Sequence, residues 1–397
     1  SKQIHKAFKA ITCAARVPSS RGASATWTNN KGEVVQSATG TAEVGRLVSS
    51  YTQSVSSKDF AEGEFDEFFK AEVEAGVSSL KSLSDFHASP LCNVPPSAQE
   101  LSDVMKVAAK RLHKSAGKDG VTNWMLVRGG RHVECALLHL YTRVWQEGHV
   151  PEAWKEAEIS YLHKGGNKAK SEVTSYRPIS LISVIAKLFT KCWLPRLVRL
   201  ATPAMAKEQG CGRKRQGSLE HLWALTELLE DCMEGRDGHA HKGVYALFAD
   251  VSKAYDQVWR SRLYLVLYTY GIRGKMWEII QQWLDGATAT TKWNGVLGPK
   301  VPLEEGLRQG CVLSPILYCV FISTLTSPRP VGMGVPPMPA GMEGLAMKLF
   351  GQGFQQPTGQ GVWAVHPSTS PQKSGQSQDP SMGQLHIVAS GSILVYG

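Results

Sequence analysis

The sequence predicts an α/β fold over residues 99–325, preceded by a helical segment and followed by a disordered tail. Three observations support this division. Within residues 99–325, stretches with the apolar period of helices alternate with short apolar runs typical of strands. In residues 1–98, short helical runs alternate with Ser-, Gly- and Thr-rich stretches. In residues 326–397 both periods disappear, and about 29% of the residues are Gly or Pro, a level associated with disorder.

The first 98 residues are predicted to hold a loop, a helix and a linker. Residues 17–28 have a loop-like composition, and residues 60–83 have a helical period with an acidic face. The stretch 89–97, SPLCNVPPS, is predicted to be a linker because its prolines stiffen the chain and stop helices.

The α/β region is predicted to contain five helices, one buried strand and a hairpin. Ser218 is a candidate N-cap, Gly148 and Gly235 are helix stops, and Ser314-Pro315 is expected to cap and start the last helix. Asn294-Gly295 supplies the positive φ that a tight hairpin turn needs. The helices are expected at about 99–113, 134–147, 218–234, 274–284 and 314–325, the strand at 244–251, and the hairpin strands at 288–293 and from 296 onward.

Composition sets broad limits on function. The net charge of +10 favours a polyanionic partner, but only weakly, because many proteins that bind nothing acidic are equally basic. The eight cysteines lack zinc-ligand spacing and are scattered through apolar stretches, which indicates buried thiols in a reducing compartment. No secretory signal and no apolar run long enough to cross a membrane is present, so we expect an intracellular protein with no membrane partner.

Three motifs carry candidate chemistry. In the string FADVSKAYDQV a predicted strand presents Asp250, where a carboxylate can hold a hard divalent cation or, alternatively, cap the next turn. In LRQGCVLSP, Gly310 allows close backbone approach and Gln309 can hydrogen-bond, although a capped helix after a turn explains part of the pattern. Arg177 in YRPISL and Lys164 beside two glycines can bind phosphate, or can simply be solvated.

These motifs resemble, in order, those of reverse transcriptases of non-LTR (LINE-like) retrotransposons. FADVSKAYD matches the first palm motif F-x-D-x-x-K-A-[FY]-D, and RQGCVLSP matches R-Q-G-x-x-x-S-P. YRPISL and the GKDGV step at 117–121 match the fingers. The loop at 208–218 resembles Q-x-G-F-R-x-G-R-[GS], with Cys211-Gly212 in place of the usual Gly-Phe order. The resemblance implies right-hand polymerase fingers and a partial palm within residues 99–325.

The resemblance also implies roles for individual residues. Asp250 would be the catalytic carboxylate and would ligate two Mg²⁺ ions, and Tyr255 would pack under the sugar of the incoming nucleotide. Asp256 is expected to be a satisfied buried acid. The partners implied are an RNA template, a DNA primer and dNTPs. The nucleotide-binding residues would be Arg177, Lys164, Tyr255, Gln309 and Gly310, and the residues that bind template or primer would be Arg213, Arg215 and Arg308.

One part of the family pattern is missing. Two-metal nucleotidyl transfer needs a second set of carboxylates, which the family supplies from an [FY]-A-D-D box soon after the helix at 314–325. The sequence contains no Asp-Asp dipeptide, and the acids of residues 326–397 are Glu343 and Asp379. We therefore expect a chain truncated before this box, with a tail that is disordered or read in a shifted frame, and little or no polymerase activity.

Other functions remain open. The chain could be a non-catalytic nucleic-acid-binding remnant that contacts the backbone by counterion release. It could also be a pseudogene product without a stable fold, because an incomplete palm exposes sheet edges. Within the enzyme class, a group II intron maturase is the nearest rival. A reverse transcriptase that works on chromosomal targets would act in the nucleus.

Overall fold

The computed structural model describes residues 24–29, 32–57, 67–205, 209–210, 217–234, 245–248, 251 and 253–325, and four short strands between 354 and 396. The chain forms two compact units. The first is built from residues 1–60, 96–192 and 282–312, and the second from 61–95, 193–281 and 313–397. Residues from both predicted segments, 1–98 and 99–325, occur in each unit, and the predicted boundary at residue 98 stays a prediction.

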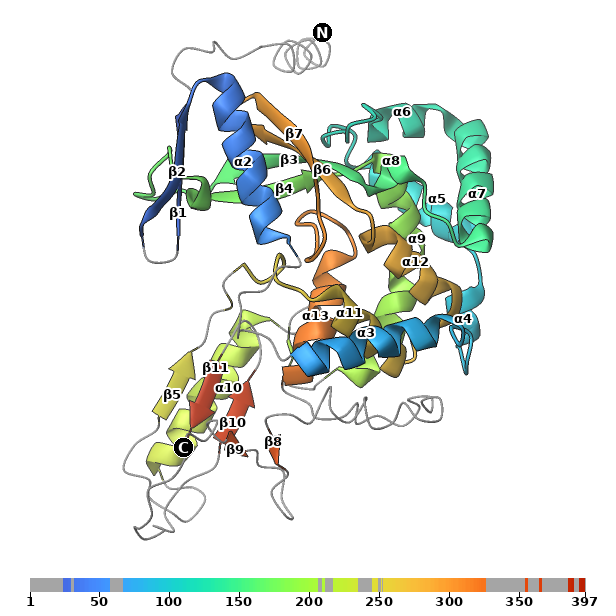
Figure 1. Cartoon of the computed structure of the whole chain (residues 1–397). Coiled ribbons are helices and arrows are strands. Elements are labelled where there is room, and N and C mark those ends of the chain that lie inside the picture. The colour runs from blue at the N-terminus through green and yellow to red at the C-terminus, as the bar shows by residue number, and fades with distance from the viewer. Residues whose placement is uncertain are drawn as a thin grey trace. The chain divides into compact units, whose positions relative to one another are not determined.

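The first unit contains a mixed four-stranded sheet in the order β4-β3-β6-β7 (Figure 1). β3 pairs antiparallel with β4 and parallel with β6, and β6 pairs antiparallel with β7. Asn294 and Gly295 have φ of 48° and 85°, so the predicted hairpin is confirmed. The strands are β3 (Glu156–His163), β4 (Tyr176–Leu181), β6 (Thr288–Trp293) and β7 (Val296–Pro302).

An N-terminal hairpin and helix pack against this sheet. β1 (Ser24–Thr28) pairs with β2 (Val34–Thr39), so the loop predicted over residues 17–28 is wrong at 24–28; strand pairing with β2 decides the structure there. α2 (Thr41–Val55) packs on β6 and β7. A Cβ on Gly298 of β7 would lie 2.4 Å from the Gly45 carbonyl oxygen of α2, so glycine at this position permits the close approach of helix and strand.

The helices of the first unit surround a core of aromatic side chains. Tyr141 and Trp154 both contact Phe189, with ring centroids 5.3 and 5.4 Å apart. Ser97 and Glu100 form a capping box at the start of α5, and Gly148, with φ 66°, ends α7 as predicted. The helices are α5 (Ala98–Ala109), α6 (Asn123–Arg128), α7 (Gly130–Glu147), α8 (Glu152–Lys155) and the first half of α9 (Val184–Ala201), with the short η1 (Val173–Ser175).

The second unit is largely helical among its described residues. In α11 (Arg260–Thr269) eight of the ten residues are buried and Ser261 and Arg262 are half-buried, and Phe69 of α3 packs edge-on against Trp259. α12 (Gly274–Leu284) has the predicted bounds, and α13 (Ser314–Ile322) starts at Ser314, but its N-cap is Leu313 and not Ser314. The remaining elements are α3 (Glu67–Lys81), α4 (Pro90–Asn93), α10 (Ser218–Glu234), η2 (Thr202–Ala204) and η3 (Ser323–Leu325).

Short strands occur in the segment predicted to be disordered. β11 (Ile393–Tyr396) pairs antiparallel with both β10 (Leu385–Val388) and β5 (Tyr245–Phe248), the strand predicted within 244–251. β8 (Phe354–Gln355) pairs with β9 (Ala364–Val365). The other residues of 326–397 lie outside the described part of the chain, where disorder or a shifted reading frame stays a prediction.

The described cysteines are all free thiols. Cys92, Cys192, Cys311 and Cys319 are buried as predicted, whereas Cys135 is exposed. The prediction is wrong for Cys135 because it lies on the solvent side of α7, whose buried face carries Leu137, Tyr141 and Val144. Within the described residues, no helix combines the length and the apolar character required to cross a membrane.

Candidate nucleic-acid interface

The β3–β4 hairpin presents two of the predicted nucleotide-binding cations. Lys164 follows β3, and Arg177 is the second residue of β4, where it pairs with Leu162. Both residues are exposed. The Lys164 ammonium donates a 2.7 Å hydrogen bond to the Thr174 carbonyl oxygen, which holds this long side chain against the hairpin. The hairpin thus carries two cations on one short, regular element.

The turn at 307–310 docks directly on β4. The Ser180 backbone N–H donates a 2.7 Å hydrogen bond to the Gln309 carbonyl oxygen. Gly310 has φ 99°, and a Cβ there would lie 2.9 Å from the Ser180 carbonyl oxygen, so both conformation and space require glycine. Two motifs about 130 residues apart in the sequence, YRPISL and LRQG, are therefore in backbone contact.

Arg308 does not face solvent. It is 4% exposed, and its guanidinium donates to the carbonyl oxygens of Lys155 at 3.0 Å and Trp283 at 2.9 Å. The guanidinium carbon also lies 5.0 Å from the centre of the Trp283 ring. These contacts use the planar fork of the side chain to join the turn to α8 and α12. They favour a structural role for Arg308 over the predicted contact with template or primer.

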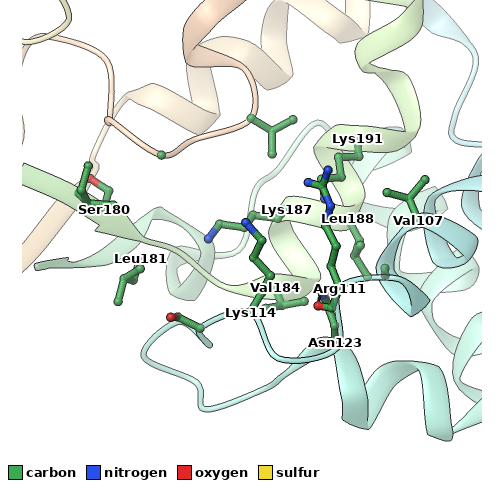
Figure 2. A pocket seen from close by; sticks show the side chains of 15 residues that line it. Val107, Arg111, Lys114, Asn123, Ser180, Leu181, Val184, Lys187, Leu188 and Lys191 are labelled. Carbon is green, nitrogen blue, oxygen red and sulfur yellow. Dashed lines mark hydrogen bonds between the residues drawn. The ribbon is translucent and has the colours of Figure 1, made fainter.

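A cavity of about 430 Å³ lies beside the docked turn and contains residues that the motifs did not single out (Figure 2). Gly310 and Ser180 lie on its lining. Four cationic side chains converge on it from the end of α5 and from α9, and we refer to it as the four-cation cavity. These cations are Arg111, Lys114, Lys187 and Lys191.

The charges in the four-cation cavity act on one another. Burial lowers the pKa of Lys187, and the nearby Lys191 and Lys114 lower it further, while Cys311 and Asp119 oppose this effect. Burial likewise lowers the pKa of Lys191, with Arg111 and Lys114 adding to the effect. Lys187 and Lys191 are one helical turn apart, and α9 contains no acidic residue. This acid-free run with Lys at i and i+4 did not enter the sequence-based predictions, although it is the local signal that points to the lysines of the cavity.

Tyr255 belongs to the second unit. Its ring stacks on that of Tyr318 in α13, with centroids 5.1 Å apart and planes inclined by 23°. Tyr255 is half-buried and lies in the turn that follows Lys253, which has φ 51°. The stacking gives the Tyr255 ring a fixed orientation. A fixed ring is what the predicted role of Tyr255, packing under the sugar of the incoming nucleotide, would require.

Three predicted site residues, Asp250, Arg213 and Arg215, lie outside the described residues. Among the residues that are described, no group of three or more His, Cys, Asp or Glu side chains could hold a metal ion. Asp256, expected to be a buried acid, is half-buried.

Comparison with known proteins agrees with the order of the motifs. A family model for reverse transcriptase (RNA-dependent DNA polymerase) matches residues 163–331. The chain is 29% identical over 263 residues to the RNA-directed DNA polymerase from mobile element jockey of Drosophila melanogaster, covering 65% of this chain and 28% of that protein.

Two further relatives come from Drosophila melanogaster. The probable RNA-directed DNA polymerase from transposon BS is 27% identical over 278 residues, which are 69% of this chain and 30% of the relative. The corresponding protein from transposon X-element is 25% identical over 239 residues, 59% of this chain and 26% of the relative. The matched region thus spans 30% or less of the length of each relative. Residues 163–331 form a reverse transcriptase domain related to those of non-LTR retrotransposons.

Proposed function

We propose that the chain is the fingers and part of the palm of an RNA-directed DNA polymerase, which pairs dNTPs with an RNA template and joins them to a DNA primer. The observation that carries this proposal is the docking of the 307–310 turn on β4, through the 2.7 Å bond from Ser180 to Gln309. This contact brings the backbone of two polymerase motifs to one place, in a domain of the reverse transcriptase family.

The proposed roles of individual residues are those that the motif resemblance implies. Arg177 and Lys164 would bind the triphosphate, Gln309 and Gly310 would lie along the nascent base pair, and Tyr255 would be the wall against the sugar. Arg213 and Arg215 would contact template or primer. Reverse transcriptases generally use divalent metal ions, which polarise the reacting phosphate and lower the pKa of the attacking hydroxyl. Asp250 is the residue that we propose as the ligand for Mg²⁺.

Primer extension tests the proposal. The purified chain is mixed with a primed RNA template, dNTPs and Mg²⁺, with Asp250→Ala as the control. Because the chain lacks an Asp-Asp box, we expect little or no extension. Extension that disappears in Asp250→Ala would refute the proposed incompleteness and establish the enzyme.

A non-catalytic nucleic-acid-binding function is the second candidate. The observation that favours it is the four-cation cavity, which lies in a part of the chain whose described residues offer no metal-binding group. Binding of a primed template that weakens steeply with salt, without extension, would support this function. If the chain neither binds the primed template nor extends the primer, both candidate functions are refuted.

A further inference from the structure

The four-cation cavity contains charges to which no predicted role has been given. Arg111 and Lys114 follow α5, and Lys187 and Lys191 lie on α9. Within the described residues, none of these four side chains forms an ion pair with a carboxylate within 4.0 Å; the ion pairs of the first unit lie elsewhere, as in Lys106–Asp103 and Lys118–Glu156. Among the residues that the structure describes, the cavity therefore holds four cationic side chains without a carboxylate at ion-pair distance.

The remaining lining is a mixture that suits a nucleotide better than a bare ion. Val107, Val184, Leu188 and Val312 supply an aliphatic surface, and Asn123 and Ser180 supply polar groups. The volume of about 430 Å³ falls in the range of roughly 300–1,000 Å³ that is usual for sites of small organic ligands. A single phosphate would leave much of this space and all of the aliphatic surface unused.

The four cations of the cavity repel one another when no anion is bound among them. Like charges one turn apart on a helix repel each other, as Lys187 and Lys191 must on α9. Burial is the largest cause of the lowered pKa of both lysines; Lys191 and Lys114 lower the pKa of Lys187 further, and Arg111 and Lys114 lower that of Lys191. Local features that oppose stability are expected at functional sites, where a ligand compensates for them. Phosphate groups would compensate here because each brings a negative charge among the four cations.

We propose that the four-cation cavity binds the phosphodiester backbone of a single polynucleotide strand, with the sugar or base of one nucleotide against its aliphatic surface. The site is separate from the proposed triphosphate cations, because neither Arg177 nor Lys164 lines it. It borders Gly310, so a strand held there would lie along the turn that we place at the nascent base pair. Its identification as the template rests on the proposed function, whereas the binding itself does not.

The test measures how the affinity of the full chain for a labelled single-stranded RNA depends on salt. Metal-free buffer with chelator separates binding from catalysis. Each phosphate contact with a single strand contributes roughly 0.7 to the slope of log K against log salt. Lys187→Gln/Lys191→Gln removes two cations from the cavity, and we expect it to reduce the magnitude of that slope by about 1.4.

The control variant is Lys106→Gln/Lys110→Gln, which removes the same charge from α5 and its C-cap, at exposed positions outside the cavity. It is expected to leave the slope unchanged. Equal effects of the two pairs, or no effect of the cavity pair, would overturn the proposal. Arg111→Gln/Lys114→Gln, at exposed positions, provides a second cavity pair if the first fails to fold, as judged by thermal unfolding.

A further measurement distinguishes a polynucleotide strand from a free nucleotide as the ligand whose phosphate the cavity binds. If the cavity pair loses affinity for a free deoxynucleoside triphosphate but keeps the full salt slope with RNA, the site belongs to the nucleotide and the strand proposal is refuted. If the slope falls as expected, the strand site stands whether or not the chain extends a primer, because primer extension tests only the proposed polymerase function.

Discussion

Arg308→Met removes a buried guanidinium from the turn that carries Gln309 and Gly310. In the structure this side chain is 4% exposed and bridges the carbonyl oxygens of Lys155 and Trp283 at 3.0 and 2.9 Å. Methionine has a similar length and fills most of the space, but it cannot donate hydrogen bonds. The turn would therefore lose its polar connections to α8 and α12 while keeping most of its apolar packing.

The expected loss of stability follows from these contacts. The Arg308 guanidinium donates hydrogen bonds to three carbonyl oxygens, those of Trp154, Lys155 and Trp283, and the two shorter bonds contribute roughly 1.5–3 kcal/mol each. The contact with the Trp283 ring, 5.0 Å away, adds roughly 0.5–2 kcal/mol. The desolvation of a buried cation opposes these contributions by several kcal/mol. We expect Arg308→Met to lower the free energy of unfolding by about 2–4 kcal/mol.

Urea unfolding of the two proteins measures this difference, and Arg308→Lys is the matched control. Lysine keeps the charge but lacks the fork that reaches two carbonyl oxygens, so we expect it to destabilise the chain as well. The opposite pattern would refute the reasoning: unchanged stability in both variants, with affinity for single-stranded RNA lost in Arg308→Met and kept in Arg308→Lys. That pattern would make Arg308 a strand contact, as the motif resemblance implied.

Three further predictions follow from single contacts. Gly310→Ala should destabilise the docked turn by about 1–3 kcal/mol, because the new Cβ meets the Ser180 carbonyl oxygen at 2.9 Å with φ 99°; faster amide exchange at Ser180 checks this, and unchanged exchange contradicts it. Tyr318→Ala should lower the free energy of unfolding by about 0.5–1.5 kcal/mol beyond the effect of lost burial, because Tyr255 loses its stacking partner. Thermal unfolding measures this loss against Tyr318→Phe, which keeps the ring and should behave like wild type. Lys187 and Lys191 have lowered pKa values in the folded chain. Between these lowered values and the ordinary value of 10.5, the unfolded chain binds more protons than the folded chain, so the free energy of unfolding should rise with pH in that window. Lys187→Gln/Lys191→Gln should reduce this rise, and an equal rise in the variant would show that the two lysines do not cause it.

The sequence alone determined those elements whose structure depends on near neighbours. The helix at 274–284 and the turn at Asn294-Gly295 were predicted with their bounds, because apolar period and positive φ are local properties. Gly148 ended its helix for the same reason. The reverse transcriptase family was also readable from the sequence, since its motifs are short contiguous strings in a fixed order.

Only the tertiary structure decided which residues meet. The parallel pairing of β3 with β6 joins segments about 130 residues apart, and no local pattern specifies it. In sequence, Arg308 looked like any motif cation, and its burial depends on the carbonyl groups of α8 and α12. Arg111 and Lys114 are about 75 residues away from Lys187 and Lys191 in the sequence, and no local pattern relates the two pairs. They line one cavity because the fold brings the end of α5 and part of α9 together beside Gly310, and electrostatic interaction depends on distance in space, which the sequence does not contain.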